Sequence, residues 1–129
     1  MAKETGLGFQ VQVDTPGDVL TDISNDVTNL SFATPRGVQD VTGVDKSAME
    51  RLLLLADFSL TLNGVFNPDL SQDVFDDLTG ERDCDLTISA ESLDNDVLFT
   101  DYAMTRNADG SFTWSAPGVL ADGTVPVWT

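Results

Sequence analysis

The chain has 129 residues, with 22 acidic against 6 basic side chains, no histidine and one cysteine, a length that fits one domain with a sizeable core. The net charge of −16 excludes proteins that grip nucleic acid, which need clustered Lys and Arg, and it disfavours docking on anionic membranes. Without histidine, catalytic triads and imidazole metal sites are excluded, and Cys84 alone cannot close an internal disulfide.

The first third of the chain alternates apolar and polar residues at the period of half-buried β-strands. Such strands are predicted over residues 9–13, 19–23 and 29–32, with a Pro-Gly turn at 15–18. Residues 33–44 contain strand-like β-branched residues flanked by Pro and Gly. This segment is therefore expected to be a flexible loop or a hairpin arm.

An α-helix is predicted over residues 45–56. Four apolar side chains in it follow the spacing i, i+3, i+4 and i+7, which makes one helical stripe: Met49, Leu52, Leu53 and Ala56. Ser47 followed by Glu50 has the form of a capping box, and Asp45 is another candidate N-cap. We therefore expect this helix to flank the β-structure.

The second half returns mostly to the strand period. Residues 58–66 form the strongest predicted strand, and Ser71 can cap a short second helix over about 71–78. Further strands, with a hairpin turn at 107–110, are predicted over 84–88, 97–105, 112–114 and 124–128. Seven or eight short strands with one good helix predict a mainly β fold, an antiparallel β-sandwich or barrel with a flanking α-helix.

No motif in the sequence indicates catalysis. With 22 acids, neighbouring pairs such as Asp76/Asp77 and Asp94/Asp96 arise from composition alone, so paired-carboxylate chemistry is not indicated. Asn107-x-Asp109-Gly110 resembles the start of a calcium loop but lacks the later bidentate Glu, and a hairpin turn explains it better. Cys84 alternates with Leu86 and Ile88, as a buried hydrophobic residue does. We expect no enzyme, no cofactor and no built metal site, although the acids of 69–101 could bind divalent cations loosely.

The order of these features resembles the major tail tube proteins of long-tailed bacteriophages over essentially the whole chain. The matching segments, in chain order, are DISNDVTNLSF (22–32), VDKSAMERLL (44–53), LTLNGVFN (60–67) and GTVPVWT (123–129). The resemblance implies a single β-sandwich domain, 1–129, whose hexameric rings stack into a hollow tube for genome delivery. It also implies three arms that contact neighbouring copies: an N-terminal arm (1–8), a loop or hairpin arm (33–44) and a C-terminal arm (118–129).

Within this resemblance, two groups of residues have expected roles. A lumen that lets DNA slide should be polar and free of basic residues, since carboxylates repel phosphate. The expected lumen-facing residues are Asp40, Asp57, Ser59, Thr61 and Asn63. The expected contacts between rings or subunits are Arg36, Val38, Val41, Val125, Val127 and Trp128, with Arg36 paired to an acid of an adjacent ring.

The expected partners are further copies of the chain, other tail proteins at the tube ends, and viral DNA that passes without specific binding. The sequence starts without the apolar stretch of a signal peptide, and its longest apolar run, Leu52–Ala56, is too short for a bilayer. We expect synthesis in the host cytoplasm, assembly into the virion tail and no membrane contact. Alternatives that remain open are a tail terminator or capsid decoration protein and, on Asp richness alone, a calcium-dependent surface binding module.

Overall fold

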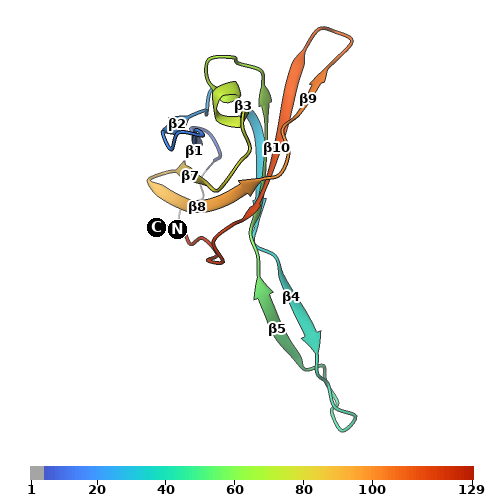
Figure 1. Cartoon of the computed structure of the whole chain (residues 1–129). Helices are drawn as coiled ribbons and strands as arrows, with labels where there is room; N and C mark the ends of the chain where they lie inside the picture. Colours follow the sequence, from blue (N-terminus) through green and yellow to red (C-terminus); the bar gives the residue numbers. More distant parts are fainter. Residues whose placement is uncertain (1–4) are drawn as a thin grey trace.

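The computed structural model describes residues 5–129 and shows a β-sandwich with two projecting hairpins (Figure 1). Ten strands and one short helix form it. The strands are β1 (Gln10–Asp14), β2 (Leu20–Asp22), β3 (Val27–Ala33), β4 (Arg36–Asp40), β5 (Arg51–Ala56), β6 (Ser59–Val65), β7 (Arg82–Ile88), β8 (Glu91–Phe99), β9 (Ala103–Arg106) and β10 (Phe112–Leu120). The helix is α1 (Ser71–Phe75). The predicted mainly β, antiparallel fold is confirmed.

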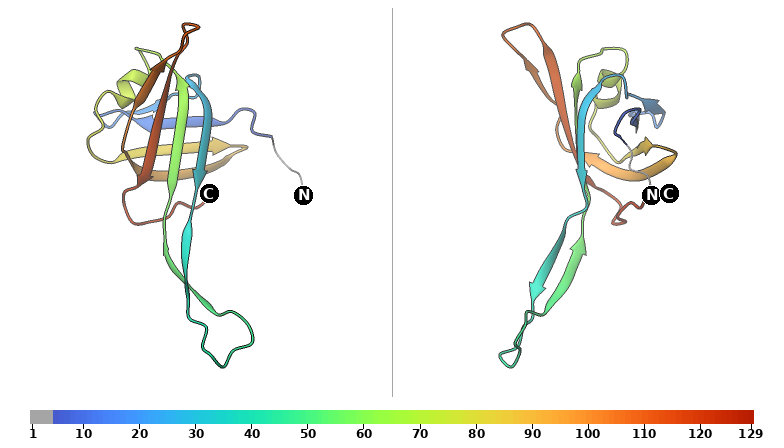
Figure 2. Two further views of the ribbon diagram at one scale, coloured as in Figure 1. Left: turned by 90° about the vertical axis from the view of Figure 1, so that its right-hand side faces the viewer. Right: turned by 180° about the vertical axis from the view of Figure 1, so that it is seen from behind.

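Eight of the strands belong to one folded sheet with the order β2-β1-β7-β8-β10-β6-β3, and β9 pairs with β10 beside β8. We call β3, β6, β10 and β9 layer A, and β2, β1, β7 and β8 layer B. Figure 2 shows the strands of the two layers crossing face to face, the arrangement of an orthogonal sandwich. Among residues 5–129 the sheet does not close into a barrel.

The core lies between the two layers because each strand turns one side inward. Layer A contributes Leu60, Leu62, Trp114 and Ala116, and layer B contributes Val11, Val13, Cys84, Leu86, Leu93 and Val97. The predicted burial of Cys84 is confirmed, and its burial raises the pKa of the thiol far above the usual range. Helix α1 covers one end of the core, where the Phe75 ring packs against Phe99 and Trp114 with centroids 5.1 Å apart.

The predicted helix at 45–56 is wrong: these residues make the return half of a hairpin with β4. Val38 pairs with Leu53, and Asp40 pairs with Arg51. The Glu50 amide, which the predicted capping box would place inside a helix, donates instead to the Thr42 hydroxyl at 2.7 Å. Four consecutive leucines satisfy the helical and the strand period equally, so pairing with β4 decides between them.

Other predictions differ from the structure at their ends. The second helix is shorter than 71–78 and stops at Phe75, and residues 124–128 form no strand. The strand predicted over 97–105 is divided into β8 and β9 at residues 100–102. The predicted hairpin turn at 107–110 is confirmed, with Gly110 at a φ of 93°. No helix in the described part of the chain has the length and apolarity to cross a membrane.

Candidate assembly surfaces

The outer face of layer A, which we call the neutral face, carries no charged side chain. Strand alternation turns these residues away from the core: Asn29, Ser31, Ala33, Ser59, Thr61, Asn63, Val65, Ala103, Thr105, Thr113, Ser115, Pro117 and Val119. Several of them, from all four strands, line one open hollow on this side. In a chain with 22 acids, a sheet face of small, uncharged residues is an unusual surface.

The outer face of layer B, which we call the acidic face, has the opposite character. Asp83 and Asp85 of β7 lie beside Asp94 and Asp96 of β8 in register, and Asp14 of β1 belongs to the same surface. The carboxylate oxygens of Asp83, Asp85 and Asp94 lie within 4.8 Å of one another. Four of the acids of residues 69–101 thus lie together on the face opposite to the neutral one.

Crowding of these carboxylates changes their protonation. Partial burial, together with the neighbouring Asp94 carboxylate, raises the pKa of Asp83 to about 7 and that of Asp85 to about 6. Hydrogen bonds from Asp85 and Asp83 lower the pKa of Asp94, which keeps its charge. Burial and the nearby Asp122 raise the pKa of Asp96. The three-carboxylate cluster at Asp83, Asp85 and Asp94 therefore holds shared protons near neutral pH.

The hairpin of residues 34–57, which we call the leucine hairpin, exposes apolar side chains on both of its faces. Leu55 is 93% and Leu53 65% exposed, and Val38, Leu52 and Leu54 are exposed beside them. Figures 1 and 2 show this hairpin extending away from the sandwich as a separate arm. A two-stranded hairpin with exposed apolar residues is marginally stable alone, and such a surface marks an interaction site.

Sequence reasoning missed the buried Arg82, which fixes the connection between α1 and β7. Arg82 is 2% exposed, and its guanidinium donates to the carbonyls of Asp14, Val74, Asp77 and Thr79. An arginine that ends the acidic stretch 69–81 gives no sequence signal of burial. The structure shows that this one cation satisfies the carbonyl groups at the end of α1.

A second buried group, Asp26, connects layer A to α1. Its carboxylate accepts hydrogen bonds from the Asn67 side chain and from the Ser71 amide, each at 3.2 Å. The backbone carbonyl oxygen of Asp26 approaches Gly64 so closely that a β-carbon there would lie 2.1 Å from it and 2.6 Å from the Trp114 ring. Glycine is therefore required at position 64.

The residues predicted to face the lumen lie in two places. Ser59, Thr61 and Asn63 share the neutral face. Asp57 is exposed at the junction of the leucine hairpin and β6, where its amide donates to the Pro35 carbonyl at 2.9 Å. Asp40 lies near the end of the hairpin, away from the other four, and hydrogen bonds from Thr42 lower the pKa of its carboxyl.

The residues predicted to contact other copies also separate into two groups. Arg36, Val38 and Val41 belong to the leucine hairpin, where the Arg36 Nε donates to the Leu54 carbonyl at 3.2 Å. Val125, Val127 and Trp128 belong to the C-terminal segment, in which Trp128 packs on Phe32 with ring centroids 6.0 Å apart. One hollow brings the groups together, since Arg36, Leu53–Ala56, Gly123 and Val125 line it.

Comparison with solved structures shows the same fold in components of a phage-like particle. One match is a chain of the virion of a native gene transfer agent particle, at a TM-score of 0.74. Another is a chain of the tail of an empty gene transfer agent particle with C6 symmetry, at 0.76. Each has 16% sequence identity and covers 98% of this chain and 99% of the other. No family model and no curated protein matches the sequence.

The fold implied by the resemblance to tail tube proteins is therefore confirmed. Structures that match nearly the whole chain are virion and tail components. What this likeness establishes is the fold, which those structures share with this chain over nearly its whole length.

Proposed function

We propose that this protein is a tail tube protein, whose hexameric rings stack into a conduit for DNA. The observation that carries the proposal is the neutral face, the one large sheet surface of the described chain without charge. A lumen needs such a surface, because basic side chains would bind phosphate by releasing counterions. The same-fold tail component with C6 symmetry supports six copies in a ring.

The other two surfaces take complementary roles in this proposal. The acidic face, on the far side of the sandwich, becomes the outer wall of the tube, where its charge maintains solubility. The leucine hairpin contacts the adjacent ring, which buries the apolar side chains that the single chain leaves in water. The remaining two arms, residues 1–8 and 118–129, add contacts, although residues 1–4 lie outside the described part of the chain and 118–120 belong to β10.

A label on either face of the sandwich tests this arrangement. Thr61→Cys places a thiol on the neutral face, and the matched variant Thr87→Cys places one on the outer side of layer B. Both are coupled to a small gold cluster before assembly, and the native Cys84 is buried and unreactive. Electron micrographs should show gold inside the tube for Thr61→Cys and on its outer wall for Thr87→Cys. The reverse pattern, or gold outside in both, would refute the assignment of the lumen.

A further inference from the structure

The C-terminal segment of residues 121–129, which we call the strap, is fastened to β8 at both of its ends. Figure 1 shows it passing from β10 beneath β8. At one end, the Ala121 amide donates to the Asp96 carbonyl at 3.1 Å. At the other end, the amides of Ser92 and Thr129 each donate to the carbonyl of the other residue at 2.9 Å. The strap therefore follows the edge of β8 that β10 leaves free.

Between these two ends the strap covers a hollow of about 380 Å³ that is lined mostly by acids. The lining residues on the sandwich are Asp83, Asp94, Asn95 and Asp96, and those on the strap are Asp122, Thr124 and Pro126. The strap thus places one more carboxylate opposite the edge of the acidic face. Since Asp122 is exposed, this contact costs the strap nothing in buried apolar surface when it opens.

The charged groups around this hollow have one sign. Those that act most strongly on the carboxyls of Asp83, Asp85 and Asp96 are all acidic, namely these three on one another and Asp14, Glu81, Asp94 and Asp122. The arginine of β7, Arg82, alternates with Asp83 and is buried on the core side of the strand, where it binds carbonyls. Protons are therefore what holds these carboxyl groups together.

Attachment of the strap and binding of protons favour each other. The attached strap buries the carboxyls of the hollow and brings Asp122 to Asp96, and both effects raise the pKa of a carboxyl. The attached form consequently binds more protons than the released form, and attachment weakens as the pH rises from the ordinary 3.8 toward the raised pKa of about 7 at Asp83. A carboxyl whose pKa is raised by one unit on attachment weakens it roughly tenfold above that pKa.

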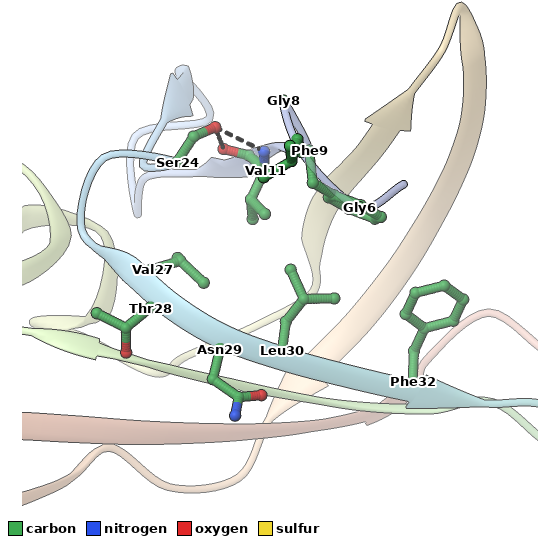
Figure 3. A pocket seen from close by; sticks show the side chains of 11 residues that line it. Gly6, Gly8, Phe9, Val11, Ser24, Val27, Thr28, Asn29, Leu30 and Phe32 are labelled. Atoms are coloured by element: carbon green, nitrogen blue, oxygen red, sulfur yellow. Dashed lines mark hydrogen bonds between the residues drawn. The ribbon is translucent and has the colours of Figure 1, made fainter. Parts of the chain in front are cut away.

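Release of the strap also uncovers apolar side chains of layer A. Trp128 packs on Phe32 with ring centroids 6.0 Å apart. Figure 3 shows Leu30 and Phe32 pointing from β3 toward the side on which Phe9 lies, where an open groove of about 480 Å³ begins. When the strap leaves β8, the Trp128 ring leaves Phe32 at the border of this groove. The same event thus frees an apolar residue on each of the two segments.

We propose that the strap is a pH-dependent latch: at low pH shared protons hold Asp122 against the carboxyls of the hollow, and their ionisation repels Asp122 and releases the strap as the pH rises to neutrality. The latch is a property of the single chain, so it stands or falls separately from the tube. Its use in assembly rests on the proposed function. There, release makes Val125, Val127 and Trp128 available to neighbouring copies.

Hydrogen exchange of single amides, followed by NMR in dilute protein, tests the latch. The Thr129 amide reports on the strap, and the Leu120 amide, which donates to the Phe58 carbonyl at 3.0 Å, is the internal reference. After correction for intrinsic rates, Thr129 should exchange roughly tenfold faster at pH 8 than at pH 5, whereas Leu120 should not change. At pH 8, 1 M salt should restore most of the protection, because it screens charges beyond about 3 Å. Exchange that is independent of pH, or an acceleration that salt leaves intact, would overturn the proposal.

A pair of matched variants identifies the responsible carboxylate. Asp122→Asn removes the charge of the strap, while the amide oxygen can still accept the bond from the Thr124 amide. Thr129 should then exchange at pH 8 nearly as slowly as at pH 5. Asp109→Asn removes one charge from a turn with the same type of bond, to the Ser111 amide, and should keep the wild-type pH dependence. An unchanged pH dependence in Asp122→Asn, or its loss in both variants, would contradict the latch.

Discussion

Asp83→Asn should stabilise the protein at neutral and higher pH. The pKa of Asp83 rises from 3.8 to about 7, so between these values the folded chain binds a proton that the unfolded chain has released. The contribution of Asp83 to the free energy of unfolding is therefore greatest below pH 4 and falls as the pH rises toward 7. Above pH 7 it is constant. A pKa rise of this size corresponds to a loss of about 4 kcal/mol in the free energy of unfolding if solvent screening is left out. Because the carboxyl is only half-buried, solvent screens its charge, and we expect Asp83→Asn to recover about 1–2 kcal/mol of this free energy.

The assay is urea unfolding of dilute protein at pH 8 and at pH 4.5, followed by tryptophan fluorescence, to which the buried Trp114 and the partly exposed Trp128 contribute. Asp83→Asn should exceed the wild type by about 1–2 kcal/mol at pH 8, or about 3–8 °C in melting temperature. The gain should shrink to less than half at pH 4.5, where the wild-type Asp83 is protonated. Glu91→Gln removes one charge from β8 outside the carboxylate cluster and serves as the control. An equal gain at both pH values, or a loss at pH 8, would refute the reasoning.

Four further outcomes follow from the surfaces and buried groups. Gly64→Ala should lower the free energy of unfolding by about 2 kcal/mol or more, since the added β-carbon overlaps Asp26 and Trp114. Gly6→Ala is the control: a β-carbon there has no atom within 4 Å, so the melting temperature should stay unchanged. Arg82→Met should lower the free energy of unfolding by about 2–4 kcal/mol, because buried carbonyls lose their hydrogen-bond donor. Arg51→Met on the exposed hairpin should lower it by under about 0.5 kcal/mol. Equal losses in urea titrations would contradict the role of Arg82. Leu53→Asp should stop tube growth but permit single rings, as seen by sedimentation and electron microscopy; tubes of normal length would exclude the hairpin from the contact between rings. Arg36→Glu should slow tube growth measured by light scattering, and unchanged kinetics would eliminate its proposed ion pair with an adjacent ring.

Most strands of the sandwich are predictable from the sequence because each has one solvent-exposed and one buried face. In β6, Leu60 and Leu62 point inward while Ser59, Thr61 and Asn63 point outward, and that alternation is visible in the sequence. The turn at Asp109-Gly110 is equally local. Where the environment is two-sided in this way, the period alone identifies the strand and assigns its faces.

The leucine hairpin is not predictable in the same way, because its apolar residues lie on both faces. The run Leu52–Leu55 fits a helical stripe as well as a strand, and a hairpin without a core of its own has no burial pattern to distinguish them. Its exposed leucines become understandable only if another chain covers them. The apolar stripe at helical spacing and the capping-box pattern therefore pointed to the wrong element.

The candidate surfaces depend on registers that no local pattern contains. That Asp83 and Asp94 share one face follows from the register of the β7–β8 hairpin, whose turn at Ser89 and Ala90 has positive φ angles without a Gly, Asn or Pro to mark it in the sequence. The strands predicted at 84–88 and 97–105 leave out residues 91–96 of β8, and so the carboxylate cluster could not be located from the sequence. The separation of a neutral face from an acidic one is a property of the folded sheet.

Electron microscopy of the purified wild-type protein over a range of concentration and salt tests the central claim most directly. We predict rings with sixfold symmetry in end-on views and hollow tubes of stacked rings in side views. Rings that never stack would instead indicate a terminating ring component. A protein that remains strictly monomeric at high concentration, in every salt condition, would contradict the account.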